Sequence, residues 1–166
     1  IPTVEITDIT PNVPTYTLAK TQTTEKPEDA TTTVTISLTT TEVVNGIRIP
    51  FVLSGTELTP DVFEAADISY MAVNGVSQTP ALYGIFVIGA QGVDNYADVV
   101  FKFADDFLTE GNAVMTLTAY DIAPAASISV NIDDTSKTPS GSISYTSATT
   151  FNWSAPRGVR SITVTG

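Results

Sequence analysis

The chain has 166 residues, 42% of them hydrophobic, which is enough for one compact domain with a smaller appendage. It contains no cysteine and no histidine, so disulfides, thiolate metal sites, a histidine-based catalytic triad and a histidine-ligated zinc centre are excluded. Eighteen acidic and seven basic residues give a formal charge of −11, and such a surface repels phosphate backbones. We therefore expect no nucleic-acid partner.

No stretch of the sequence approaches the ~18 consecutive apolar residues that a membrane helix requires, so we expect no membrane insertion. The sequence begins at Ile1 rather than at a methionine. We expect it to be an interior piece of a longer polypeptide.

The composition predicts an all-β fold. Thr, Val, Ile, Tyr and Phe dominate, and Gly, Pro, Asn and Asp interrupt them at short intervals, a pattern typical of an antiparallel sandwich. Apolar and polar residues alternate with period two in several segments, as expected for half-buried strands. We predict seven strands near residues 15–20, 31–39, 47–53, 82–87, 97–103, 113–120 and 127–132.

Turn residues separate these strands, at Asn45-Gly46, at Gly89 and Gly92, and around Pro124. The stretch 54–80 is long for a connector. It predicts either a short extra strand around 69–73 or a helical turn around 60–66.

The two ends of the chain differ from the middle. Residues 4–10 alternate like a strand, and a similar pattern returns at 130–136, either by chance or because modules follow one another in series. After Pro139 the sequence resembles a linker followed by a second small β element, which cannot bury a core alone. We divide the chain into 1–12 (linker or last strand of a preceding module), 13–138 (sandwich) and 139–166 (linker and start of the second element).

An ordered set of short motifs runs through residues 13–138. It comprises Pro14-Thr15-Tyr16-Thr17-Leu18, Val44-Asn45-Gly46, Leu53-Ser54-Gly55-Thr56, Ala65-Ala66-Asp67-Ile68, Ala104-Asp105-Asp106 with Thr109-Glu110-Gly111, and Asn131-Ile132-Asp133-Asp134-Thr135-Ser136. This set resembles the Calx-β domain family, whose members recur in sodium–calcium exchangers, bacterial surface proteins and phage virion proteins. The resemblance implies a seven-stranded antiparallel Ig-like sandwich, with a short extra β element following it here.

The tail carries a second resemblance. Pro156-Arg157-Gly158-Val159-Arg160-Ser161-Ile162-Thr163-Val164-Thr165-Gly166 is similar to the entry strand of glycine-rich phage tail and collar-type proteins. Its presence beside a Calx-β-like module indicates a phage virion protein.

The acidic residues are unevenly distributed between the predicted loops. In an antiparallel sandwich alternate loops gather at the same end, so the loops after the first, third and fifth strands share an end with the exit of the seventh. That end carries Glu25, Glu28, Asp29, Asp61, Glu64, Asp67, Asp105, Asp106, Glu110, Asp133 and Asp134, and the other carries Glu42, Asp94 and Asp121. The cluster is suited to a hard cation such as Ca²⁺; alternatively, its carboxylates cap turns and face water.

The family resemblance implies which of these acids would bind calcium: Glu28, Asp67, Asp105, Asp106, Glu110 and Asp134. Two positions depart from the family pattern, because Ala113 stands where a second Glu often follows and Asp29 replaces the usual Gly. A glycosidase-like use of Asp105, Asp106 and Glu110 is disfavoured, since adjacent Asp residues on a turn point apart and no aromatic-lined cleft is evident. We expect no enzyme.

Two functions follow as expectations. The first is a structural or adhesion module of a phage virion protein (fibre, whisker, decoration or tail component) on the virion surface. Its partners would be other structural subunits, copies of itself, or a host-surface glycan or protein. The alternative is a calcium-stiffened repeat of a bacterial secreted adhesin or matrix protein, extracellular or at the cell surface. A calcium-sensing regulatory domain is a third, weaker reading.

Overall fold

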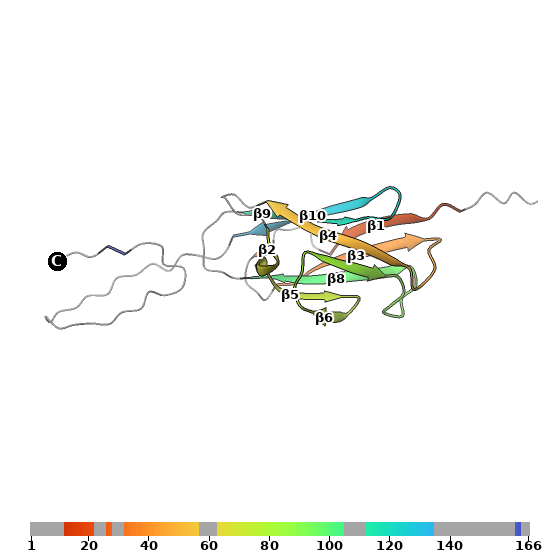
Figure 1. The fold of residues 1–166 in the computed structure, drawn as a ribbon, viewed down its shortest axis with the longest axis horizontal. Coiled ribbons are helices and arrows are strands. Elements are labelled where there is room, and N and C mark those ends of the chain that lie inside the picture. The colour runs from red at the N-terminus through yellow and green to blue at the C-terminus, as the bar shows by residue number, and fades with distance from the viewer. Residues whose placement is uncertain are drawn as a thin grey trace, which may run out of the picture.

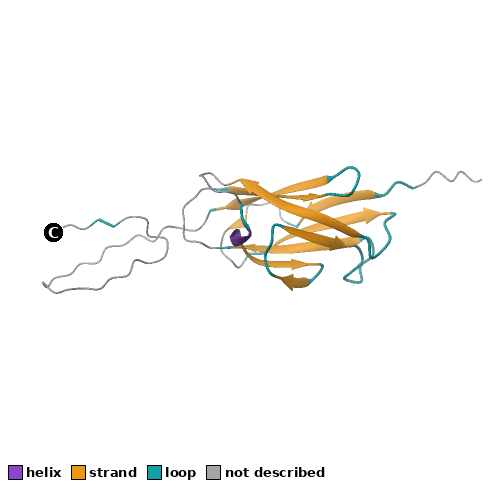
Figure 2. Cartoon of the chain, in the orientation of Figure 1, coloured by secondary structure: helices purple, strands orange, loops and turns teal. Residues whose placement is uncertain are grey.

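The computed structural model describes residues 12–21, 26–27, 32–56, 63–104, 112–134 and 162–163. Within these ranges the chain forms an all-β sandwich with one short 3-10 helix (Figures 1 and 2). The elements are β1 (Thr15–Lys20), β2 (Lys26–Pro27), β3 (Val34–Thr41), β4 (Arg48–Thr56), η1 (Ala65–Asp67), β5 (Ile68–Val73), β6 (Val76–Gln78), β7 (Tyr83–Val87), β8 (Tyr96–Phe103), β9 (Ala113–Ala119) and β10 (Ala126–Asp133). The predicted all-β sandwich class is confirmed.

The strands form two five-stranded sheets, in the orders β1-β3-β8-β5-β6 and β2-β10-β9-β4-β7. Neighbouring strands are antiparallel, except that the two residues of β2 pair in parallel with the end of β10. The chain crosses repeatedly from one sheet to the other, for example from β3 to β4 and from β8 to β9. The two sheets therefore pack face to face as the layers of one sandwich (Figure 1).

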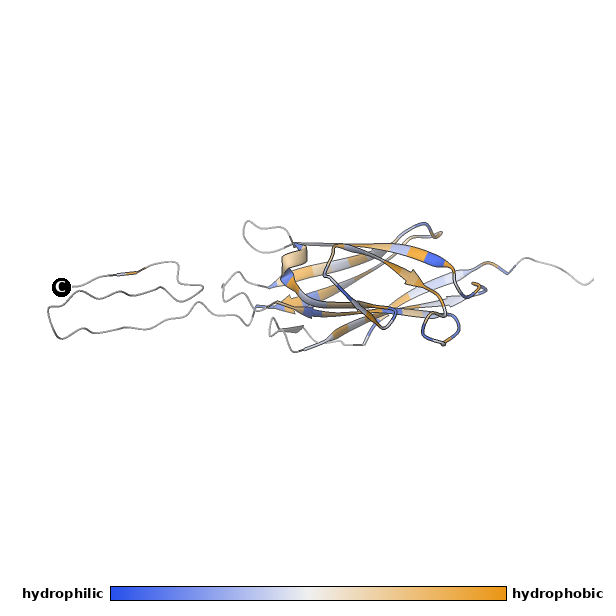
Figure 3. Cartoon of the chain, turned by 60° about the horizontal axis from the view of Figure 1, so that its bottom comes forward, coloured by the Kyte–Doolittle hydropathy of each residue, from blue (hydrophilic) through white to orange (hydrophobic). Residues whose placement is uncertain are grey.

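The period-two alternation of the sequence places the core between the sheets. In β3, Val34, Ile36 and Leu38 are buried, while the residues between them are half-buried. Strands β8 and β9 repeat this pattern over their whole length, and Figure 3 shows hydrophobic and hydrophilic positions alternating along the strands. Of the buried residues described, the only polar one is Thr40, whose hydroxyl has no hydrogen-bond partner there.

Aromatic rings fill the core at two places. Phe51 of β4 packs on Phe86 of β7 with 4.7 Å between ring centroids. Phe63, which precedes η1, meets Phe103 of β8 edge to face at 6.4 Å. The first pair fixes β7 to the sandwich, and the second fixes the segment that leads into η1.

The prediction of seven strands was wrong in number. Each of the seven predicted segments overlaps a strand, but β2, β5 and β6 are additional. Strands β5 and β6 form a hairpin through Asn74 and Gly75, whose φ angles of 51° and 75° are those of a type I′ turn. Asn-Gly is the strongest short-range hairpin signal, and the sequence carried it at these positions.

The long connector contains both of the structures that the sequence left open. The helical turn is η1, which begins at Ala65, and the extra strand is β5, which follows it directly. The described sandwich runs from Thr15 to Asp133. The predicted segment before residue 12 and the predicted β element after 138, apart from Ile162 and Thr163, lie outside the described residues.

Candidate functional site

One end of the sandwich collects the loops that the sequence predicted to be acidic. Strands β1, β4, β8 and β10 end there, and β3, β5 and β9 begin there, so we call it the η1 end (Figure 1, left). Two hydrogen bonds bring its segments together. The Ala104 N–H donates to the Asp67 carbonyl over 2.8 Å, and the Asp134 N–H donates to Oδ1 of Asn112 over 3.4 Å.

Asp67 is half-buried at the end of η1 and has a structural role. Its Oδ2 accepts a hydrogen bond from the Glu64 backbone N–H, which closes the turn before β5. A carboxylate in this position satisfies a donor that the short helix leaves without a backbone partner. The turn-capping alternative weighed for these acids therefore applies to Asp67.

Asp134 is half-buried and directly follows β10. Its backbone lies beside Asn112, the residue that leads into β9, just as Asp67 lies beside Ala104, the residue that follows β8. Residues 105–111 connect Ala104 to Asn112 in the sequence. Asp67 and Asp134 are two of the six predicted ligands. They therefore lie beside the residues that precede and follow this acidic segment in the sequence.

The other four predicted ligands, Glu28, Asp105, Asp106 and Glu110, lie outside the described residues. The parallel pairing of β2 with β10 places Pro27, the residue before Glu28, opposite Asp133. Among the residues that the structure describes, no three or more acidic side chains are grouped closely enough to hold a metal ion. The calcium site remains a prediction.

The opposite end of the sandwich, formed by loops 42–47, 88–95 and 120–125, uses its polar residues for loop structure. Asn45 donates from Nδ2 to Oδ1 of Asp94 over 2.6 Å, joining the first two loops. Glu42 and Asp121 both have φ near 60°, the left-handed conformation of tight turns. These acids are accounted for by turn geometry.

A polar cluster lies on the outer face of β8. The Tyr96 hydroxyl donates to Oδ2 of Asp98 over 3.3 Å, and Oδ1 of Asp98 accepts from Nε2 of Gln91 over 3.0 Å. Burial raises the pKa of Tyr96, and the charge of Asp98 and its hydrogen bond to the phenol act in the same direction. The cluster fastens loop 88–95 to the sheet.

A groove of about 850 Å³ that sequence reasoning missed lies between β6 and β7, the outermost strands of the two sheets on one side of the sandwich. Arg48 of β4 is the one charged residue of its lining, and the other lining residues are uncharged. Tyr83 and Val76 are the most exposed large apolar residues of its lining. Sequence alternation identified the strand that carries Tyr83 but not its position at a sheet edge.

Comparison with known proteins gives little. No family model matches the chain, and no curated protein sequence matches it. Among solved structures, it is similar to a conjugative transposon lipoprotein from Bacteroides eggerthii DSM 20697 at 8% identity and a TM-score of 0.40, with 72% of this chain and 97% of that one covered. A likeness of this degree says nothing about function. The described part of the chain contains no helix long and apolar enough to cross a membrane.

Proposed function

We propose that the chain is a structural and adhesion module of a phage virion protein, displayed at the virion surface and without a catalytic role. The observation that carries the proposal is the geometry of its connections. Thr15 opens β1 opposite Thr41, at the end of the sandwich away from η1, and Asp133 closes β10 at the η1 end. The chain thus enters at one end of the long axis and leaves at the other (Figure 1).

This arrangement suits a spacer. Modules joined through opposite ends extend a polypeptide by one sandwich length each, whereas modules joined through one end fold back on themselves. The continuous core between the sheets makes the unit resistant to bending. The tail resemblance to phage tail and collar-type proteins favours a virion as the setting. Other structural subunits, further copies, or a host-surface glycan or protein are the partners in this proposal.

The spacer proposal can be tested by small-angle X-ray scattering on two copies of the 166-residue chain joined in tandem. We expect a maximum dimension about twice that of a single copy. A dimension close to that of one copy would mean that the modules fold side by side and would contradict the proposal. Antibodies raised against the chain should label purified phage particles; labelling confined to bacterial surfaces would favour the adhesin alternative.

The calcium-stiffened adhesin repeat stays as the second candidate because Asp67 and Asp134 lie at the η1 end beside Ala104 and Asn112, the residues that precede and follow positions 105–111 in the sequence. A cation that binds only the folded chain raises its melting temperature with concentration. We expect millimolar Ca²⁺ to raise the melting temperature over that in chelator. We also expect Asp134→Asn to reduce the rise and Glu42→Gln, at the opposite end, to leave it unchanged. Equal melting temperatures with Ca²⁺ and with chelator would exclude the site.

A further inference from the structure

The β7 edge has backbone groups without partners. Pairs Leu53–Leu82 and Ile47–Ile88 are hydrogen-bonded, so in the antiparallel ladder between them Gly84 and Phe86 bond to β4. Tyr83, Ile85 and Val87 therefore direct their N–H and C=O groups away from β4, toward the outside of the sheet. An edge of this kind is a template for another strand.

Asn74 covers only half of that edge. Its Nδ2 donates to the Ile85 carbonyl over 3.0 Å, and its Oδ1 accepts from the Val87 N–H over 3.2 Å. The Val87 carbonyl accepts from the Ala90 N–H over 3.2 Å. In the described part of the chain, the Ile85 N–H and both backbone groups of Tyr83 are left without a protein partner.

Exposed apolar side chains surround these three groups. Tyr83 is 70% exposed and Val76, across the groove on β6, is 67% exposed. Val52 of β4 stands opposite Tyr83 and is 41% exposed, and Pro50 stands opposite Ile85. The backbone groups and the apolar side chains form one continuous surface, which we call the β7 edge surface.

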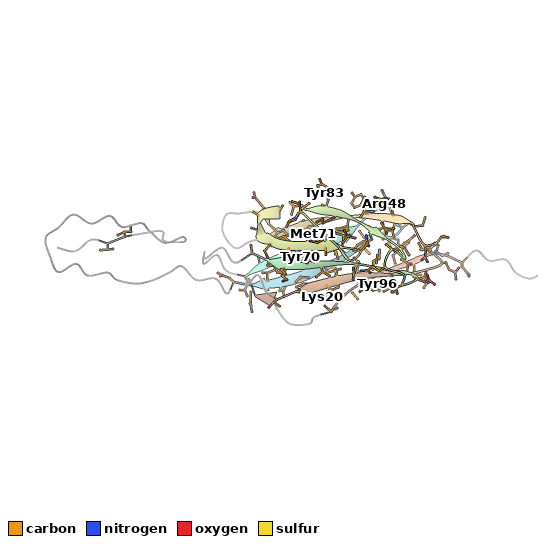
Figure 4. All side chains as sticks on the ribbon, turned by 90° about the horizontal axis from the view of Figure 1, so that it is seen from below. Lys20, Arg48, Tyr70, Met71, Tyr83 and Tyr96 are labelled. Atoms are coloured by element: carbon orange, nitrogen blue, oxygen red, sulfur yellow. The ribbon has the colours of Figure 1, made fainter. Side chains whose placement is uncertain are left out.

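The charge of this surface is opposite to that of the chain. Of the residues that line the groove, Arg48 is the single base, and none is acidic, although the chain as a whole carries a charge of −11. Within the described residues, the Arg48 side chain has no hydrogen-bond or ion-pair partner. Figure 4 shows Arg48 and Tyr83 on one side of the sandwich and Lys20 on the opposite side.

We propose that the β7 edge surface binds an extended acidic segment of a partner protein, which adds to β7 as a further strand. The segment would pair with the free groups of Tyr83 and Ile85, direct its apolar side chains across the groove toward Val76, and place its carboxylates on the sheet face that carries Arg48. A second copy of this chain fits less well, because β7 contains no acidic residue and β7-to-β7 pairing therefore supplies Arg48 with no carboxylate from the paired strand. The proposal does not depend on the proposed function.

The test uses the full chain and a blocked synthetic heptapeptide, Thr-Val-Glu-Val-Glu-Val-Thr, titrated by ¹H–¹⁵N NMR. We expect saturable binding with the largest shifts at the amides of Tyr83 and Ile85. A control peptide with Lys in place of both Glu should bind about tenfold more weakly to the wild-type chain, and Arg48→Glu should reverse that preference. A control peptide N-methylated at alternate residues should not bind, because it cannot pair with the edge.

A proline variant separates the edge from its side chains. Ile85→Pro removes the outward N–H without removing a β4–β7 hydrogen bond, whereas Ile85→Ala removes only side-chain atoms. We expect Ile85→Pro to weaken peptide binding at least about tenfold and Ile85→Ala about threefold or less, with both variants retaining the amide spectrum of the fold.

Several results would overturn the proposal: no saturable binding of the acidic peptide, equal binding of the N-methylated peptide, or no change with Arg48→Glu. Light scattering tests whether a second copy of this chain occupies the β7 edge surface instead. If the chain is a dimer in solution and Ile85→Pro makes it a monomer, the occupant is a second copy and the acidic-partner proposal is wrong.

Discussion

The two lateral edges of the sandwich are closed to different degrees. At the edge formed by β1, β2 and β10, the chain itself passes from one sheet to the other, because β1 pairs with β3 and β2 pairs with β10. Lys20 of β1 also reaches across and donates from Nζ to the Ser129 carbonyl of β10 over 2.8 Å. At the β6–β7 edge, Asn74 makes the side-chain hydrogen bonds to β7, and a groove remains.

The outer face of the second sheet, β2-β10-β9-β4-β7, shows the same contrast between its closed side and its open side. Toward the closed edge, hydroxyl groups pair across β9 and β10, Thr116 with Ser129 over 2.8 Å and Thr118 with Ser127 over 3.0 Å. Toward the β7 edge, Val52 faces Tyr83 and Pro50 faces Ile85. Polar groups on the closed side are satisfied by their neighbours, while the open side presents apolar surface and free backbone groups. This difference is the reason for proposing the β7 edge as the place where a partner strand adds.

The largest expected effect tests how β7 is held. Phe86→Ala removes a fully buried ring that packs on Phe51, so we expect the free energy of unfolding to fall by about 3–5 kcal/mol. Leu18→Ala on β1, at the closed edge, removes a half-buried side chain and should cost about 1–2 kcal/mol. Urea denaturation measures both. Equal losses of unfolding free energy in the two variants would contradict this prediction, because they would mean that β1 and β7 are held by core packing to the same degree.

Gly84 tests the closeness of β7 to the core. A Cβ at this position would lie against the Phe51 ring, nearer than van der Waals contact allows, so we expect Gly84→Ala to lower the free energy of unfolding by about 1–3 kcal/mol. The double variant with Gly84→Ala and Phe51→Leu should lose less unfolding free energy than the two single losses added together, because the smaller side chain makes room for the new Cβ. Strict additivity of the two substitutions in a double-mutant cycle would contradict the predicted contact.

Asn74→Gly opens the covered half of the β7 edge. Glycine accepts the φ of 51°, so the change removes chiefly two hydrogen bonds and should cost about 1–2 kcal/mol of unfolding free energy. Amide exchange at Val87 should become faster than in the wild-type chain. Asn45→Ala, which removes a side-chain bond between loops 42–47 and 88–95, serves as control. Unchanged exchange at Val87 would show that Asn74 does not protect the edge.

The smallest effect lies away from both edges, at Tyr96. Its pKa is raised in the folded chain, so the neutral phenol is favoured by folding. The folded state binds more protons than the unfolded state once pH exceeds about 10, the unfolded pKa of tyrosine, and stability falls as pH rises from there through the folded pKa. Thermal melts of Tyr96→Phe should lose less stability over this alkaline window than the wild type. An identical pH profile would contradict the shift.

The amino-acid sequence by itself determined the fold class and most of the strands. Period-two alternation is a local property, and it identified the inward positions Ile36, Phe101 and Leu117 because a strand that buries one face must place its apolar residues there. The sequence also placed η1 and the exit of β10 at one end, since antiparallel order alone assigns alternate loops to alternate ends. The six calcium ligands implied by the family resemblance remain a prediction, with Asp67 and Asp134 the two that the structure describes.

Only the tertiary structure decided which strands lie at the sheet edges. Nothing in the run from Tyr83 to Val87 distinguishes an edge strand from a central one, because edge position depends on which distant strands pair, and here β7 pairs only with β4. The turn at Asn74 had a recognisable Asn-Gly signal, but that its side chain would reach Ile85 and Val87 followed from the packing of one sheet beside the other. The same packing left Tyr83 and Arg48 together at an open edge, where local pattern predicted only a strand.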